Sequence, residues 1–175
     1  MEAANREESQ DFIPEEYFDM IFSDKPSIEG DIIDLDGKVL GRHRGIEHYT
    51  VGQRRGLGVS ANRPLYVHSI DAKNNLVVLA DNEDLNSEGL IADDFVWPGN
   101  VVPSEPIKAL VKIRLASRPV PATVEKYIPS EDEEYVGIPY KITFETPQRA
   151  VAPGQSVVLY IDGTIFGGGI ISKTL

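Results

Sequence analysis

Short runs of alternating apolar and polar residues cover most of the chain from Gly30 onward. The runs are rich in β-branched residues and are bounded by Gly, Pro or Asp, which is typical of β-strands separated by turns. Evenly spaced short strands of this kind predict a small closed barrel or a sandwich. The runs are GDIIDLDGKVLG, PLYVHSIDAKNNLVVLA, GLIADDFVW, PIKALVKIRLAS, VPATVEKYIP, PYKITFETPQRAV and QSVVLYIDGTIFGGGIISK.

Turn residues between the runs indicate which strands form hairpins. The pairs Asp36-Gly37 and Asp162-Gly163 each separate two apolar runs, and Asp-Gly is a preferred hairpin turn. Residues 71–75 are expected to form a third turn, and residues 81–89 an irregular loop or linker. The sequence therefore predicts two units, a central domain over residues 1–84 and a β-barrel over residues 85–175.

One segment has helical rather than β periodicity. In residues 12–22, FIPEEYFDMIF, the apolar side chains fall on one stripe. Pro14 suits a first helical turn, and Glu15 and Glu16 suit the positive end of the helix dipole. We expect one helix here, so the predicted fold class is mainly β, with a small α+β central domain of β-hairpins before the barrel.

The charges are distributed unevenly. The chain has a formal net charge of −11, which argues against a nucleic-acid partner. However, residues 38–63 hold six basic side chains and one acidic side chain, and residues 108–126 hold five and one. We call these the first and second basic segments. Local potential matters more than total charge for binding a polyanion, so the two segments could form one RNA-facing surface or remain scattered, solvated charges.

Composition excludes several classes of protein. The 175 residues include no cysteine, so disulfides and thiolate metal sites are excluded. No apolar run approaches the roughly 18 residues that indicate a membrane helix. The start, MEAANREESQ, is polar and acidic, unlike a secretory signal. We expect a cytoplasmic protein with no membrane partner.

The second basic segment alternates as a strand does. Lys108, Lys112 and Arg114 would share an outward face, which suits binding to phosphate and equally suits simple solubility. On the other face, the side chains expected in the core are those of Val111, Ile113 and Leu115.

Candidate catalytic, nucleotide and metal sites are weak. GQRRGLG and FGGGII lack the context of phosphate-binding loops, and Gly167, Gly168 and Gly169 predict a bulge or a close backbone approach. His43 and His48 lack the converging ligands of a metal site and are expected to be structural or, as the alternative, to contact RNA. The carboxylates of residues 130–134 are typical of a solvated loop. We expect no metal site and no catalytic residues in this chain.

Two long stretches identify a family. GDIIDLDGKVLGRHRGIEHYTVGQRRGLGV and TPQRAVAPGQSVVLYIDGTIFGGGII closely resemble the central and C-terminal parts of the bacterial tRNA-specific 2-thiouridylases (MnmA/TrmU). The resemblance covers almost the whole chain. It implies a six-stranded-type antiparallel β-barrel, resembling the second domain of elongation factor Tu, after the central domain.

The resemblance also implies a function. Enzymes of this family transfer sulfur to C2 of the wobble uridine of tRNA. They bind ATP and Mg²⁺ in an N-terminal ATP-pyrophosphatase domain, and a sulfur-carrier protein supplies the sulfur. This sequence resembles the tRNA-binding portion without that domain, so no cofactor is expected in it. The expected partners are tRNA, the ATP-pyrophosphatase domain and the sulfur carrier. The alternative is a protein-interaction module that docks on a separate catalytic domain.

Near its start, the chain departs from the family pattern. The family usually has Ser-Gln-x-Ile-Cys-Phe-Ile, whereas this chain reads Ser9-Gln10-Asp11 followed directly by Phe12-Ile13. The Ile-Cys pair is missing, and with it the cysteine that carries the sulfur. We therefore expect this polypeptide alone to be non-catalytic.

By position, the resemblance assigns candidate tRNA contacts on the barrel to Arg114, Leu115 and Gln155. We add Arg118 and Arg149 because of their charge. In the first basic segment, the resemblance places a loop toward the catalytic domain and the tRNA. Its candidate residues are Tyr49, Gln53, Arg54 and Arg55. Arginine suits such a surface because its planar guanidinium binds phosphate through two hydrogen bonds and stacks on bases.

Overall fold

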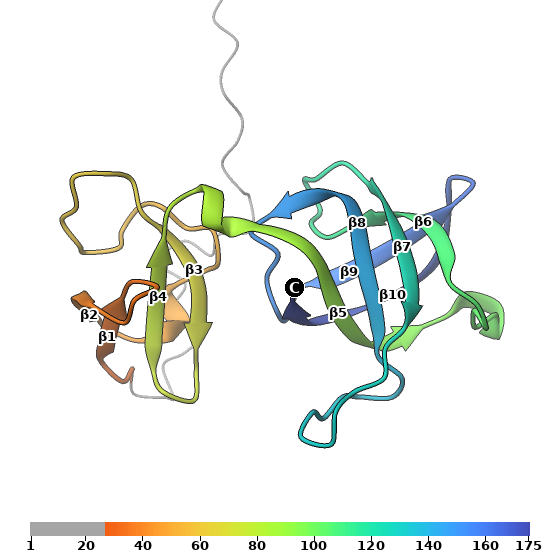
Figure 1. Cartoon of the computed structure of the whole chain (residues 1–175), viewed down its shortest axis with the longest axis horizontal. Coiled ribbons are helices and arrows are strands. Elements are labelled where there is room, and N and C mark those ends of the chain that lie inside the picture. The colour runs from red at the N-terminus through yellow and green to blue at the C-terminus, as the bar shows by residue number, and fades with distance from the viewer. Residues whose placement is uncertain (1–26) are drawn as a thin grey trace, which may run out of the picture.

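The computed structural model describes residues 27–175, which form two β units side by side, joined by a short linker (Figure 1). The helix predicted over residues 12–22 lies outside the described residues. No helix in the described part of the chain is long and apolar enough to cross a membrane.

The first unit is a four-stranded sheet made of two hairpins. Its strands are β1 (Gly30–Ile33), β2 (Val39–His43), β3 (Tyr66–Asp71) and β4 (Leu76–Ala80). The order across the sheet is β2-β1-β4-β3, with β1 and β4 parallel and Ile32 opposite Val77. The sequence predicted both hairpins, but not the parallel pairing that joins them. That pairing depends on contacts between segments more than 40 residues apart.

The first hairpin turn is wider than a two-residue Asp-Gly turn. The N–H of Gly37 donates to the carbonyl of Asp34 at 3.1 Å, and the N–H of Asp34 donates to the carbonyl of Lys38 at 3.0 Å. The Asp34 carboxylate also accepts hydrogen bonds from the backbone N–H groups of Asp36 and Lys38. The turn thus begins at Asp34, and Gly37 supplies the left-handed conformation that closes it (φ 81°).

A long connection between β2 and β3 completes the core of the first unit. It contains a short 3-10 helix, η1 (Ile46–His48), and it contributes Leu57 to the core. The buried core side chains are those of Ile32, Leu57, Val67, Val77 and Leu79. The loop from residue 49 to 59 is therefore anchored at its far end by a buried leucine and is not a free arm.

The linker is shorter than the sequence indicated. After the 3-10 helix η2 (Glu83–Leu85), strand β5 begins at Asn86, so residues 86–89 belong to the barrel and not to a loop. Asn86 and Ser87 pair with Arg149 and Gln148 of β8. This early start of β5 was missed because its first residues, Asn-Ser-Glu-Gly, are polar.

The second unit is a closed antiparallel barrel of six strands in the order β10-β5-β8-β7-β6-β9. Its strands are β5 (Asn86–Val96), β6 (Ile107–Lys112), β7 (Val120–Lys126), β8 (Tyr140–Arg149), β9 (Ser156–Ile161) and β10 (Thr164–Thr174). A 3-10 helix, η3 (Pro98–Asn100), follows β5. The predicted mainly-β fold with a six-stranded barrel is confirmed. Closure leaves no unpaired sheet edge.

The barrel interior follows the alternation of the strands. Val111 and Ile113 are buried as predicted, but Leu115 is 85% exposed, so its predicted place in the core is wrong. The strand ends at Lys112, and residues 114–117 form a turn in which the N–H of Ser117 donates to the carbonyl of Arg114. The two-residue period no longer applies beyond the end of the strand.

The glycines of β10 let aromatic side chains approach the strand closely. A β-carbon on Gly167 would lie 2.5 Å from the Trp97 ring, and one on Gly169 would lie 2.7 Å from the Phe95 ring. The register of β10 also shifts around these glycines. Both predicted roles, bulge and close approach, are confirmed. At the preceding hairpin turn, Asp162 and Gly163 have φ angles of 49° and 75°, as an Asp-Gly turn requires.

Candidate nucleic-acid interface

The glycine-rich loop of the first basic segment is attached to strand β3 through backbone hydrogen bonds. The N–H of Gly52 donates to the carbonyl of Val67 at 2.7 Å, and the N–H of Val67 donates to the carbonyl of Gln53 at 2.9 Å. Val67 is fully buried. Residues 52 and 53 are therefore fixed against the core of the first sheet, immediately before the two arginines.

Gln53 organises the loop with its side chain. Its Oε1 accepts from the N–H of Thr50 at 3.0 Å, and its Nε2 donates to the carbonyl of Arg55 at 2.9 Å. Both polar atoms of the amide are thus used inside the loop. The structure gives Gln53 a supporting role, and it displays Arg54 and Arg55 as exposed side chains between this anchor and buried Leu57.

Tyr49 lies at the inner end of the same loop. Its ring packs edge-on against His43, with 5.9 Å between the ring centroids. Burial raises the pKa of Tyr49, and the nearby Arg44 charge opposes this shift. Tyr49 therefore helps to pack the loop on the sheet, and it is half-buried where Arg54 and Arg55 are exposed.

On the barrel, the backbone of Ala150 joins the linker to the second basic segment. Its N–H donates to the carbonyl of Leu85 at 2.7 Å, and its carbonyl accepts a hydrogen bond from Nη2 of Arg114. Ala150 is buried and has a φ of 53°. Arg114 is consequently held against the barrel at the point where the chain enters from the first unit.

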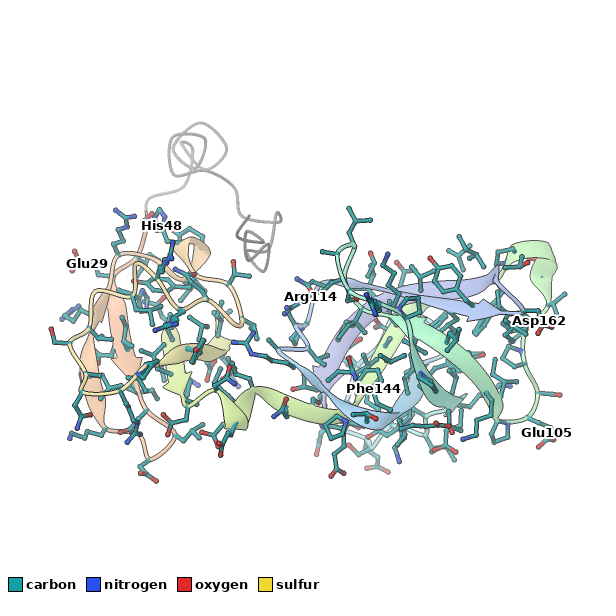
Figure 2. All side chains as sticks on the ribbon, turned by 90° about the horizontal axis from the view of Figure 1, so that it is seen from above. Glu29, His48, Glu105, Arg114, Phe144 and Asp162 are labelled. Carbon is teal, nitrogen blue, oxygen red and sulfur yellow. The ribbon has the colours of Figure 1, made fainter. Side chains whose placement is uncertain are left out.

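The loop and the barrel meet at Gly52. A β-carbon at Gly52 would lie 2.9 Å from Cβ of Ala150, and the same point lies 3.6 Å from Nη1 of Arg149 and 3.9 Å from Nη2 of Arg114. Figure 2 shows Arg114 at the end of the barrel nearer the first sheet, with Asp162 and Glu105 at the opposite end. The first and second basic segments thus come together at the junction of the two units.

Arg149 crosses this junction. Its guanidinium carbon lies 5.0 Å from the ring centroid of Tyr66 on β3, and its Nε donates to Oδ1 of Asn82 in the linker at 2.8 Å. The guanidinium carbon of Arg54 lies 6.0 Å from the same ring centroid. Both distances are in the range of cation–π contacts. Two predicted site residues, one from each unit, are therefore brought to a single aromatic ring.

Several basic side chains of the two basic segments form ion pairs with carboxylates. Arg42 pairs with Glu29 at 3.9 Å, and Arg63 pairs with Asp81 at 2.8 Å. On the barrel, Lys108 pairs with Glu145 at 3.2 Å. These exposed pairs contribute little to stability. They do neutralise two basic side chains of the first basic segment, Arg42 and Arg63, and one of the second, Lys108.

The other predicted residues of the barrel, Leu115, Arg118 and Gln155, differ in exposure and in hydrogen bonding. Leu115 and Arg118 are exposed in the connection between β6 and β7. Gln155 is half-buried, and its backbone carbonyl accepts from the N–H of Ile171 at 2.8 Å. Within residues 27–175, Oε1 of Gln155 is buried and accepts no hydrogen bond.

The histidines have local partners. The ring of His43 is almost fully buried. Its Nδ1 accepts a hydrogen bond from the N–H of Gly45 at 3.1 Å, and its Nε2 lies 3.0 Å from the carbonyl oxygen of Asn75. His48 lies 3.7 Å from a Glu47 carboxylate oxygen. Among the described residues, no three His, Asp or Glu side chains are grouped so that they could hold a metal ion. The structural interpretation of His43 is confirmed.

Sequence reasoning missed three residues at the junction, Tyr66, Asn82 and Ala150. Tyr66 begins an ordinary strand, and Asn82 lies in a polar run, so neither stands out in the sequence. Alanine rarely adopts a positive φ, so nothing predicts the conformation of Ala150. Their roles depend on contacts across the junction, which a local pattern does not encode.

Comparisons with known proteins agree with this two-part architecture. Residues 19–81 match the family model described as tRNA methyl transferase PRC-barrel domain, and residues 87–171 match the model described as aminomethyltransferase beta-barrel domain. The chain thus consists of a PRC-barrel-type domain followed by a six-stranded β-barrel domain.

Relatives with both domains are tRNA-specific 2-thiouridylases named MnmA. The protein of Halothermothrix orenii is 39% identical over 97% of this chain and 46% of its own length. The protein of Chlorobium phaeobacteroides is 40% identical over 97% and 48%, and that of Microcystis aeruginosa is 43% identical over 82% and 39%. The chain belongs to the tRNA-specific 2-thiouridylase family and corresponds to its central and C-terminal domains. It spans less than half the length of these three relatives.

Proposed function

We propose that this chain is the tRNA-holding portion of a 2-thiouridylase, the enzyme that transfers sulfur to C2 of the wobble uridine. The observation that supports it is the meeting of the two basic segments, where the backbone of Gly52 lies beside Arg114 and Arg149. Clustered arginines create a local positive potential that can attract an anion even in a chain with a net charge of −11. RNA backbone is such an anion, and binding to it depends strongly on salt.

In such an enzyme, the chemistry belongs to a separate ATP-pyrophosphatase domain. That domain binds ATP and Mg²⁺, and a sulfur-carrier protein delivers sulfur to the enzyme. We propose that this chain needs none of them to bind tRNA. Adding ATP at constant free Mg²⁺ and ionic strength should therefore leave its affinity for tRNA unchanged.

Filter binding with bulk tRNA at two salt concentrations tests the proposal. Affinity should fall steeply with salt, and replacing both Arg54 and Arg55 with Ala should weaken binding at low salt. Replacing Lys73 and Lys141 with Ala removes the same charge outside both basic segments and is the matched control. Absence of binding at low salt, or binding insensitive to salt, contradicts the proposal.

The same variants separate the alternative, in which the basic loop docks on a catalytic domain. A pull-down with an isolated ATP-pyrophosphatase domain in the presence of RNase reports protein docking without RNA. If Arg54→Ala/Arg55→Ala abolishes this docking and leaves tRNA affinity intact, the loop is a protein-docking element. If it lowers tRNA affinity and leaves docking intact, the loop faces RNA.

A further inference from the structure

Tyr66 is contacted by two cations that come from different domains. The guanidinium carbons of Arg54 and Arg149 lie 6.0 and 5.0 Å from its ring centroid, so they are at most 11 Å apart. Arg54 belongs to the loop of the first sheet, and Arg149 ends strand β8 of the barrel. Contact with the same aromatic ring therefore limits the separation of two positive groups that come from the two sides of the junction.

The orientation of Arg149 is fixed by a second contact. Its Nε donates to Oδ1 of Asn82, which leaves the terminal nitrogens of the guanidinium for other acceptors. Lysine has a single nitrogen and no planar group, so it could not hold both Asn82 and the Tyr66 ring in this way. The site thus uses properties specific to arginine, beyond its charge.

Among the described residues, no carboxylate forms an ion pair with either cation. Across residues 27–175, carboxylates pair with Arg42, Arg63 and Lys108, but none pairs with Arg54 or Arg149. Two guanidinium groups held close together repel each other, and an anion between them removes that repulsion. A separation below this 11 Å limit is compatible with a single phosphate, whose several oxygens can accept hydrogen bonds from two arginines.

Building on the proposed function, we propose that Arg54 and Arg149 bind one RNA phosphate jointly across the domain junction. Tyr66 and Asn82 position the two guanidinium groups for this contact. The phosphate then bridges the two domains, so their relative placement becomes part of the recognition of RNA. Phosphate contacts fix the position of a protein on nucleic acid without reading sequence.

A double-mutant cycle on tRNA affinity tests whether the site is shared. Arg54→Ala and Arg149→Ala should each weaken binding about tenfold, and the double variant should be little weaker than either one. The slope of log affinity against log salt should fall by about one phosphate contact in all three variants. Losses that multiply to about a hundredfold, with two contacts removed from the slope, overturn the shared site.

The positioning residues supply a second test that leaves both charges in place. Asn82→Ala should weaken tRNA binding severalfold, as should Arg149→Lys, whereas Tyr66→Phe keeps the ring and should bind as wild type. Asn74→Ala, at the exposed β3–β4 turn, is the matched control for Asn82. Wild-type affinity in both Asn82→Ala and Arg149→Lys overturns the positioning role. If the wild-type chain binds no tRNA at all, the proposed function is wrong, and this inference, which rests on it, is wrong too.

Discussion

Gly52 and Ala150 touch across the junction of the two domains, with room for no side chain at residue 52. A β-carbon there would lie 2.9 Å from Cβ of Ala150, closer than real β-carbon contacts. Gly52 also has a φ of 90°, in the region that favours glycine. This contact limits how closely the basic loop can approach the barrel.

Gly52→Ala should therefore move the loop away from the barrel without changing the charge of the protein. We expect a loss of about 1–2 kcal/mol from the backbone conformation and an added effect from the clash with Ala150. The natural absence of cysteine allows spin labels at Lys73→Cys and Glu105→Cys, one in each domain. The distance distribution between these labels should shift or broaden in Gly52→Ala, and tRNA affinity should fall.

Gly58→Ala is the matched control for Gly52→Ala. Gly58 has a φ of 70°, and a β-carbon there would meet no atom within 4 Å. It should lose a similar amount of stability from the backbone while leaving the interdomain distance unchanged. Equal shifts in both variants would mean that loop strain, and not contact with the barrel, controls the distance.

His43 should be a neutral ring with its proton on Nε2. Its Nδ1 accepts the hydrogen bond from Gly45, so the proton must lie on Nε2, which donates to the carbonyl of Asn75. His43→Phe keeps an aromatic ring but leaves the N–H of Gly45 and the carbonyl of Asn75 without their hydrogen bonds. The free energy of unfolding should fall by about 2–4 kcal/mol. Nitrogen NMR of the ring checks the tautomer, and chemical denaturation checks the stability. A protonated Nδ1 would contradict the assignment.

The Gln53 side chain makes two hydrogen bonds inside the loop, so changing it should make the backbone that carries Arg54 and Arg55 less rigid. In Gln53→Glu, the acceptor for the Thr50 N–H remains, but a carboxylate replaces the donor that binds the carbonyl of Arg55. We expect a loss of about 1–2 kcal/mol. Hydrogen exchange should speed up at Gly52 and Val67, the two amides that pair the loop with β3. Unchanged exchange at both amides would show that the backbone pairing with Val67 alone holds the loop.

The barrel was largely predictable because its strands are defined locally. Short β-branched runs bounded by turn residues indicated β6 to β10, and Asp162-Gly163 adopts the positive φ angles that such a pair permits. The local residue pattern predicted the wrong strand boundary at two places, the start of β5 and the end of β6. Strand β5 starts in a polar run because it pairs with β8, and Leu115 is exposed because β6 has already ended.

The candidate site was predictable only as a set of charges. The basic composition of residues 38–63 and 108–126 identified Arg54 and Arg114, but not that the two segments meet. That meeting depends on the linker, on the parallel pairing of β1 with β4 and on Tyr66, whose aromatic ring gives no local indication of two arginine partners. Long-range geometry of this kind is encoded by packing between segments rather than by residue periodicity.

The acidic loop between β7 and β8 is exposed at residues 130–132 and 134, as predicted for a solvated loop, but Glu133 is half-buried and makes contacts that order the loop. Its carboxylate accepts hydrogen bonds from Nζ of Lys173 at 3.0 Å, the backbone N–H of Ser130 at 3.1 Å and the hydroxyl of Tyr127 at 2.9 Å. The Lys173 contact, followed by those from Ser130 and Tyr127, lowers the pKa of Glu133 from 4.5 to about 2.

This shift predicts an acid-sensitive contribution to stability. Because the folded pKa is below the ordinary value, the contribution is complete above about pH 4.5 and is lost as the pH falls toward 2. Glu133→Gln should therefore melt below wild type at pH 7, and the gap should close between pH 4.5 and 2. Glu131→Gln, exposed in the same loop, should show no such closing gap. A gap for Glu133→Gln that stays constant with pH would mean that shape, and not the carboxylate charge, accounts for its effect.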